Sequence, residues 1–130
     1  MRHINLFKKV CDVSTTDCFD YNNYLVFAVD KSQVSRAIGK NGCNIKKLSI
    51  ILRRRIKVIP LPGGLSDMRE FISALTDEIP INTLELKDQT VMIGANKQTK
   101  AMLIGRNRAR EQELGEILSR LFGIKKVRIG

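Results

Sequence analysis

The sequence predicts an α+β fold built from two tandem copies of one small unit, each a three-stranded sheet packed against helices. The first observation is a turn with glycine at both ends, Gly39-Lys40-Asn41-Gly42, set between two helical patterns and two apolar strand patterns. The second is that the same order of patterns returns 66 residues later. The third is a stretch rich in proline and glycine at 60–64, which divides the two copies.

The first copy begins with a helix and a hairpin. Apolar residues recur at helical spacing over 2–10, which predicts a short opening helix. Strands are predicted at 17–21 and 24–30, joined by Asn22-Asn23, because asparagine tolerates the left-handed conformation of a tight hairpin. Residues 25–29 are apolar on both faces, so this strand is expected at the centre of the sheet.

The glycine-ended turn then joins two helices. Apolar residues at helical spacing predict helices over 31–38 and 44–54, with Leu48 and Ile51 in the core. A closing strand is predicted at 56–59. Glycine at both ends allows positive φ and leaves the peptide amides uncovered, while the second helix points its partly positive N-terminus at the turn. An anionic backbone is the natural occupant of such a turn.

The stretch at 60–64 reads as a linker, because proline blocks a helix or central strand and Gly-Gly resists either. The predicted domains are therefore 1–60 and 67–130, with a linker at 61–66. The second domain repeats the order of the first. Its predicted elements are a helix at 67–75 capped by Ser66 or Asp67, strands at 83–87 and 90–93, helices at 97–104 and 109–122, Gly123 as a C-terminal cap, and a strand at 125–129.

Matches at the fixed offset of 66 support the repeat. They pair 25–28 with 91–94, Ile38-Gly39 with Ile104-Gly105, Asn41 with Asn107, and Leu48, Ile51, Leu52 and Arg54 with Leu114, Ile117, Leu118 and Arg120. Agreement of this kind at one spacing is hard to obtain by chance and indicates a tandem duplication.

Charge points to a polyanion as partner. The chain of 130 residues carries a net charge of +10, and the segment 31–66 contains nine Lys or Arg residues and no Asp or Glu. Aromatic residues make up only 5% of the chain, which argues against domains that bind bases by aromatic stacking. Charge of one sign beside a phosphate-shaped turn favours nucleic acid.

Catalysis is not predicted. His3 is the only histidine, and Cys11, Cys18 and Cys43 lack metal-ligand spacing, so we expect reduced thiols, no metal, no cofactor and no small-molecule substrate. The N-terminus lacks a hydrophobic signal core and no apolar run approaches a membrane span, so a cytoplasmic protein without membrane contact is expected.

The order strand, helix, GxxG turn, helix, strand, together with Ile38-Gly39-Lys40-Asn41-Gly42, resembles the KH motif of RNA-binding proteins. The extra helix and strand before this core resemble the type II arrangement, αββααβ in each copy. KH domains clamp about four nucleotides by their backbone. The resemblance therefore implies single-stranded RNA as the ligand.

Two such domains and little else resemble the short archaeal members of the NusA family. The resemblance is carried by Thr16-Asp17-Cys18, by 37–48 and by 117–124. It implies a role in transcription elongation, termination or antitermination, with RNA polymerase as a further candidate partner. Bacterial relatives carry additional N-terminal and S1 domains, for which this sequence has no room, so polymerase binding through those domains is not implied.

The resemblance also implies the binding residues. Phosphates would lie over the amides of the first turn, and bases would enter a groove between the second helix and the last strand, with Leu48 in its wall. The implied RNA-binding residues are Ile38, Gly39, Lys40, Asn41, Gly42, Asn44, Ile45, Lys46, Lys47, Ile56, Lys57, Val58, Gly105, Arg106, Asn107 and Arg108. Periodicity alone also fits the aliphatic members to the core, and for Ile45 the choice stays open.

The second turn departs from the pattern because Arg108 replaces the last glycine. Glutamates on the following helix, at 111, 113 and 116, add negative charge. Either this turn binds RNA weakly, which we favour, or its arginines hold phosphates by side chain. The geometry of the turn is expected to persist, on the argument that Arg108 can begin a helix without positive φ.

Two other functions fit parts of the sequence. A helix-turn-helix reader of double-stranded DNA would also repeat helix, turn and helix, with Asn44 as its one suitable base-reading residue. A protein-interaction scaffold on polymerase or the ribosome is the other alternative; its binding would survive high salt and the loss of Gly42.

Overall fold

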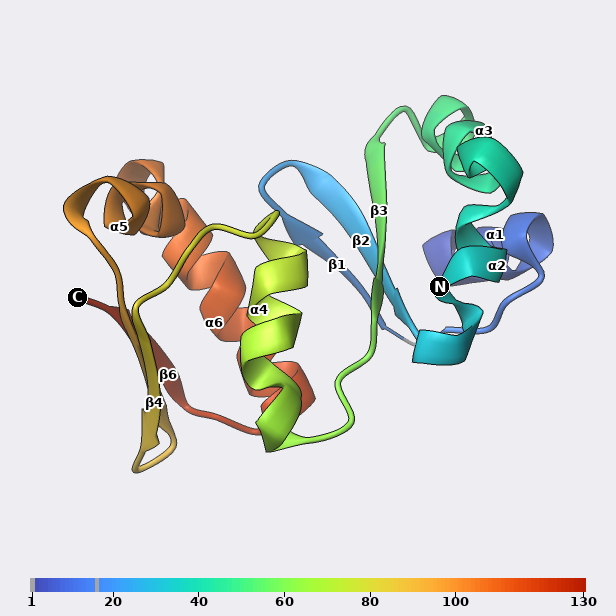
Figure 1. The fold of residues 1–130 in the computed structure, drawn as a ribbon. Helices are drawn as coiled ribbons and strands as arrows, with labels where there is room; N and C mark the ends of the chain where they lie inside the picture. The colour runs from blue at the N-terminus through green and yellow to red at the C-terminus, as the bar shows by residue number, and fades with distance from the viewer. Residues whose placement is uncertain (1, 16) are drawn as a thin grey trace. The chain divides into compact units, whose positions relative to one another are not determined.

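The computed structural model describes residues 2–15 and 17–130 and divides the chain into two compact units, Met1–Leu61 and Pro62–Gly130 (Figure 1). Each unit contains helices and one three-stranded sheet, which confirms the predicted α+β class. Thr16, part of the family resemblance, lies outside the described residues.

The first unit follows the order helix, two strands, two helices, strand. Its elements are α1 (Arg2–Cys11), β1 (Asp17–Tyr21), β2 (Tyr24–Val29), α2 (Val34–Ile38), α3 (Cys43–Leu52) and β3 (Arg55–Pro60), with 3-10 turns at Lys31–Gln33 and Lys40–Gly42. The strand β2 lies between β1 and β3, antiparallel to the first and parallel to the second, so the predicted central strand is confirmed. Asn22 and Asn23 take φ of 50° and 66°, as the predicted tight hairpin requires.

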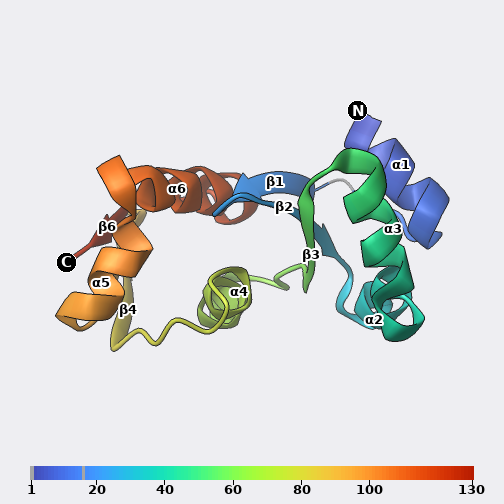
Figure 2. The same ribbon diagram turned by 90° about the horizontal axis from the view of Figure 1, so that it is seen from above.

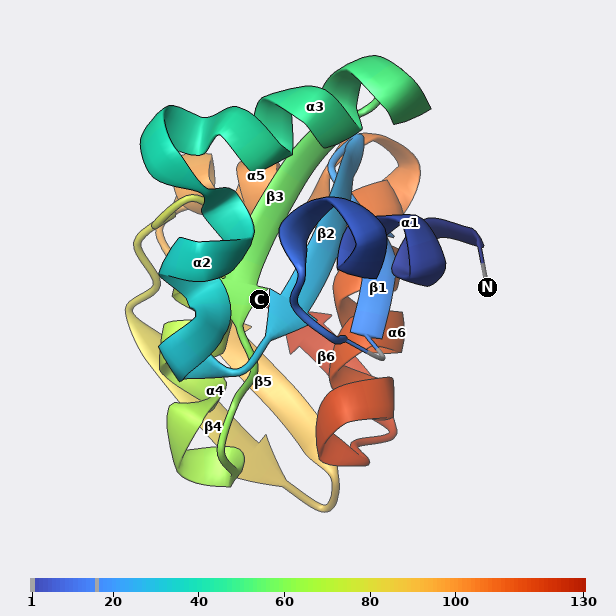
Figure 3. The same cartoon turned by 90° about the vertical axis from the view of Figure 1, so that its right-hand side faces the viewer.

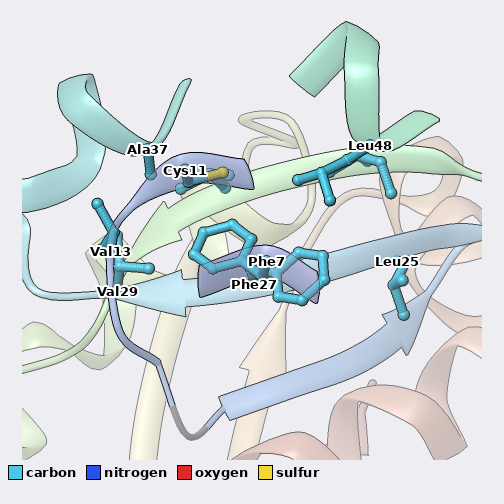
Figure 4. Packing of buried hydrophobic residues seen from close by; sticks show 10 residues of the cluster. Phe7, Cys11, Val13, Leu25, Phe27, Val29, Ala37 and Leu48 are labelled. Atoms are coloured by element: carbon cyan, nitrogen blue, oxygen red, sulfur yellow. The ribbon is translucent and has the colours of Figure 1, made fainter. Parts of the chain in front are cut away.

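The core of the first unit lies between its sheet and its helices. All three helices cover the same face of the sheet (Figure 2). From the strand side Leu25, Phe27 and Val29 point into this layer, because alternate residues of a strand share a face. The ring of Phe27 stacks on that of Phe7 from α1, with centroids 4.3 Å apart and planes at 17° (Figure 4). This stack ties the opening helix to the central strand.

The second unit repeats this order. Its elements are α4 (Met68–Leu75), β4 (Thr83–Lys87), β5 (Thr90–Gly94), α5 (Lys97–Ile104), α6 (Ala109–Phe122) and β6 (Lys126–Ile129), with 3-10 turns at Leu65–Asp67 and Arg106–Arg108. The strand β5 is central, antiparallel to β4 and parallel to β6. Helix α4 packs on α6 through an edge-to-face contact of Phe71 with Phe122, whose centroids are 5.8 Å apart.

The repeat changes spacing over its last helix and the connection that follows it. Leu25 pairs with Ile56 in the first sheet, and Val91 pairs with Val127 in the second. The offset is therefore 66 residues before the helix and 71 after it, because α6 has 14 residues where α3 has 10 and the connection to the last strand is one residue longer. Both helices end at a left-handed residue, Arg53 or Gly123, so the cap predicted at Gly123 is confirmed.

Two local predictions are wrong. Ile51 was predicted to lie in the core with Leu48, but Ile51 is 53% exposed whereas Leu48 is fully buried. Neither Ser66 nor Asp67 caps α4 through its side chain. The Asp67 carboxylate instead accepts a hydrogen bond of 2.7 Å from the Gly63 amide and so holds the end of the linker.

Candidate nucleic-acid interface

The turn between α2 and α3 redirects the chain through left-handed backbone (Figure 3). Gly39 ends α2 with φ 81° and ψ 167°, and its amide donates to the Ser35 carbonyl at 3.0 Å. Asn41 and Gly42 then take φ of 56° and 73° before α3 begins. The Gly42 amide donates to the Gly39 carbonyl at 3.1 Å, so this donor is used inside the turn.

The two glycines serve different needs. A Cβ on Gly39 would stand 2.8 Å from the Cys43 sulfur and 2.9 Å from the Asn44 side chain, in a region of φ and ψ that only glycine adopts readily. A Cβ on Gly42 would meet nothing within 4 Å. Gly39 is therefore required for packing, whereas the space above Gly42 is open to solvent.

Asn44 braces the turn. Its side-chain amide donates to the Arg36 carbonyl at 3.2 Å and thereby links the first turn of α3 to the end of α2. This hydrogen bond uses one donor of Asn44, which the sequence suggested as a base-reading residue of a helix-turn-helix protein. Lys40, Asn41, Lys46 and Lys47 are exposed around the same turn, in positions where their side chains reach solvent.

The second turn has nearly the same backbone. Gly105, Asn107 and Arg108 take φ of 73°, 55° and 61°, and the Arg108 amide donates to the Gly105 carbonyl at 3.2 Å. The expected persistence of the turn geometry is confirmed, but the reason given for it is wrong. Arg108 does not avoid positive φ: it adopts the left-handed conformation of the glycine that it replaces.

Arg108 of the second turn and Arg110 of α6 are both engaged by glutamates of α6. A terminal nitrogen of Arg108 lies 2.9 Å from Oε1 of Glu111, and Nε of Arg110 lies 3.2 Å from Oε1 of Glu113. Glu111 also lies in the first turn of the helix, where a carboxylate is favoured by the partly positive helix end. An incoming phosphate would therefore compete with carboxylates already in place.

A groove runs between α3 and the edge strand β3 of the first unit. It is lined by Tyr24, Ile45, Lys46, Ser49, Ile50, Arg55 and Ile56. Four of these side chains are aliphatic or aromatic, and the two charged ones are basic. Ile45, left open between core and groove by the sequence, lies at this groove and also packs against the core.

The second unit has a groove in the equivalent place, between α6 and β6. It is lined by Glu111, Gln112, Gly115, Glu116, Ser119, Arg120, Lys125, Lys126 and Val127. The two grooves are of similar volume, about 580 and 700 Å³, so chemistry rather than space separates them. At the offset of 66, Ile45 becomes Glu111 and Ile50 becomes Glu116.

The structure brings two parts of the sequence-predicted site together, namely the first turn and the start of α3. Ile56 and Val58, and Leu48 with them, belong to the buried core; Ile56 alone of these three also lines the groove. Sequence reasoning did not single out Tyr24, Ser49, Ile50 and Arg55, which line it as well. The sequence shows Arg53-Arg54-Arg55 as a run of positive charge, but nothing in it indicates that Arg55 lies over the Tyr24 ring.

The positive charge is concentrated in the first unit. Met1–Leu61 has twelve basic and four acidic residues, a net charge of +8, whereas Pro62–Gly130 has eleven and nine, a net charge of +2. The unit with the apolar groove is thus also the strongly basic one.

Other kinds of site have little support. In residues 2–15 and 17–130 there is no group of three or more His, Cys, Asp or Glu side chains that could hold a metal ion. None of the helices formed by those residues combines the length and apolar character needed to cross a membrane.

Comparison with known proteins points in one direction. No protein-family model matches the chain. A curated protein of Methanococcus vannielii, named a probable transcription termination protein NusA, is 24% identical over 97% of this chain and 73% of its own length. A protein of the same name from Methanocaldococcus jannaschii is 25% identical over 97% of this chain and 69% of its own length. These matches support a NusA-like relation.

A solved structure extends this likeness to the fold. The crystal structure of APE1850 matches 99% of this chain and 96% of its own, with a TM-score of 0.72 and 27% sequence identity. The NusA-like relation and this structural match both span nearly the whole chain, including both units.

Proposed function

We propose that this chain is a NusA-like factor that binds single-stranded RNA during transcription through a KH domain formed by its first unit. The observation that carries the proposal is a glycine-ended turn, open above Gly42, that adjoins an apolar groove within the unit of net charge +8. A phosphate backbone requires the turn and the charge, and unpaired bases require the groove.

In this proposal the amides of Lys40 and Asn41 face a phosphate, because the Gly42 amide is used within the turn. Lys46 and Lys47, exposed at the start of α3, neutralise neighbouring phosphates. Ile45 and Ile56 supply apolar surface for the bases along the groove. Asn44 acts by holding the turn in shape rather than by reading bases.

The second unit is proposed to bind RNA weakly. Its turn keeps the backbone geometry, but Arg108 places a side chain where Gly42 leaves open space, and Glu111 and Glu116 stand in its groove. Both glutamates repel a phosphate backbone. The second unit is then a KH domain in fold whose RNA contacts are secondary to those of the first.

The test is a fluorescence-anisotropy titration of short single-stranded RNA, A-rich oligomers included. The wild type is compared with the double variant Lys40→Asp, Asn41→Asp, with folding checked by circular dichroism. The matched control is Arg106→Asp, Asn107→Asp, which makes the same change in the second turn. We expect the first variant to lose binding and the control to keep most of it; equal binding by all three proteins refutes the proposal.

Duplex DNA and a protein partner are the competing outcomes. A helix-turn-helix reader needs an available polar residue early in α3, and the one candidate, Asn44, is bonded to the Arg36 carbonyl. Retention of duplex DNA in place of RNA would favour that function. Binding to polymerase that survives Gly42→Arg and high salt would favour the scaffold.

A further inference from the structure

The far end of the first groove has a composition that a phosphate clamp does not require. Tyr24, at the start of β2, is the register partner of Arg55, at the start of β3. The Arg55 guanidinium carbon lies 5.6 Å from the centroid of the Tyr24 ring, and Nζ of Lys57 lies 5.6 Å from the same centroid. Both distances are within the range of cation–π attraction.

Across the groove from this pair stands an exposed aliphatic side chain. Ile50, on α3, is 78% exposed although it lines the same groove as Tyr24 and Arg55. Exposure to water does not stabilise an apolar side chain such as that of Ile50. Because Ile50 and the Tyr24 ring line the same groove, both sides of the groove carry apolar surface at this point. A flat, partly apolar group fits such a groove.

The second unit provides an internal comparison. Thr90 and Lys126 are register partners at the place of Tyr24 and Arg55, and Glu116 takes the place of Ile50. The cation is kept there, but the ring and the aliphatic side chain are both lost. The first unit therefore has Tyr24, Ile50 and the open turn above Gly42, and the second unit lacks all three.

We propose that Tyr24, Arg55 and Ile50 form a nucleobase subsite at the end of the first groove, which takes an unpaired RNA base beyond those held at the turn. This inference rests on the proposed function. Base stacking on an aromatic ring or an arginine guanidinium is a general means of holding single-stranded RNA. Ile50 lies eight residues after Gly42, roughly 12 Å along the axis of α3, so the base belongs to a nucleotide outside the clamped tract.

The test compares oligomers of four nucleotides, the tract that a KH turn clamps, with oligomers of about eight. We expect Tyr24→Leu to weaken binding of the longer RNA roughly tenfold, as loss of one stacked base does, and to leave the shorter RNA unchanged. Tyr24→Phe keeps the ring and should bind both like the wild type. Ile50→Glu, which copies the second unit, should weaken only the longer complex.

Tyrosine fluorescence gives a direct readout because the chain has no tryptophan and only two tyrosines, of which Tyr21 is buried. The longer RNA should quench Tyr24 emission in the wild type and have little effect on Tyr24→Phe, in which only Tyr21 emits. Equal weakening of both RNA lengths by Tyr24→Leu, or no weakening of either, would overturn the subsite. If the wild type binds neither RNA, the proposed function fails as well, which distinguishes the two failures.

Discussion

At the scale of single residues, the two glycines of the first turn separate structural need from functional need. Gly39 holds a backbone conformation reserved for glycine and lies against Cys43 and Asn44. Gly42 takes ordinary left-handed φ, and its counterpart Arg108 shows that a non-glycine residue can occupy it. Replacement of Gly42 therefore alters the exposed surface of the turn more than its backbone conformation.

Alanine substitution should rank the glycines. We expect Gly39→Ala to lower the free energy of unfolding by about 3 kcal/mol or more, since strain and a clash add together. Gly42→Ala should cost about 1 to 2 kcal/mol, the penalty for left-handed φ alone. Gly115→Ala, within α6 and free of contacts at 4 Å, should stabilise by roughly 1 kcal/mol. Urea denaturation measures all three, and a larger loss for Gly42 than for Gly39 would contradict the structure.

Cys11 should make the first unit sensitive to alkali. Burial, with a smaller contribution from the charge of Cys43, raises the pKa of the Cys11 thiol from 9.0 to about 11. The folded state therefore favours the protonated thiol, and the associated stability is present below pH 9 and lost as pH rises from 9 to 11. We expect the free energy of unfolding to fall about 2 to 3 kcal/mol more for the wild type than for Cys11→Ala over that interval. Parallel pH profiles for the two proteins would refute this.

At the scale of elements, the turn and the start of the helix after it have the same backbone geometry in both units, but the two helices carry side chains of opposite charge near their start. The backbone of the two turns agrees closely, yet α3 begins with Lys46 and Lys47 nearby whereas α6 begins with Glu111 paired to Arg108. Side chains rather than backbone therefore distinguish a proposed clamp from a weak one. This distinction can be reversed by substitution.

A gain of binding tests that argument. In a background with Lys40→Asp and Asn41→Asp, the further changes Arg108→Gly and Glu111→Ile restore the open glycine and the aliphatic wall in the second unit. We expect RNA binding to return in part, measured by anisotropy. The matched control is Glu113→Gln in the same background, which removes one charge without opening the turn and should not restore binding. A folded protein that still binds no RNA would show that the second groove lacks more than these two features.

At the scale of the whole molecule, charge is divided unequally between two units of one fold. The first unit carries +8 of the net +10, so long-range attraction of a polyanion is directed chiefly at that unit. Exposed ion pairs such as Arg36 with Asp12 contribute little to folding, because solvent screens both partners. The excess charge is better explained by binding than by stability.

Salt dependence should reveal how many phosphates are neutralised. If about four phosphates contact the first unit, the logarithm of the association constant should fall with the logarithm of salt concentration with a slope of about −3. Lys46→Ala and Lys47→Ala should each reduce that slope by about 0.7. Lys97→Ala, in the second unit, serves as the control and should leave it unchanged. A slope near zero would contradict a phosphate-binding role.

The sequence by itself determined the two copies, the order and approximate bounds of their elements, and the two equivalent turns, of which only the first has glycine at both ends. Periodicity, turn residues and a fixed offset are local signals, and short-range sterics translate them directly into backbone conformation. The basic segment and the altered second turn were visible in the same way.

Only the tertiary structure decided what surrounds each side chain. The periodicity of α3 marked Leu48 and Ile51 alike, but burial depends on where neighbouring elements end, and only Leu48 is covered. Tyr24 and Arg55 are far apart in sequence and meet because parallel pairing of β2 with β3 sets them in register. The left-handed φ of Arg108 is likewise imposed by the turn, because a non-glycine residue does not favour that conformation by itself. Contacts between distant segments, rather than local preference, thus shape the candidate site.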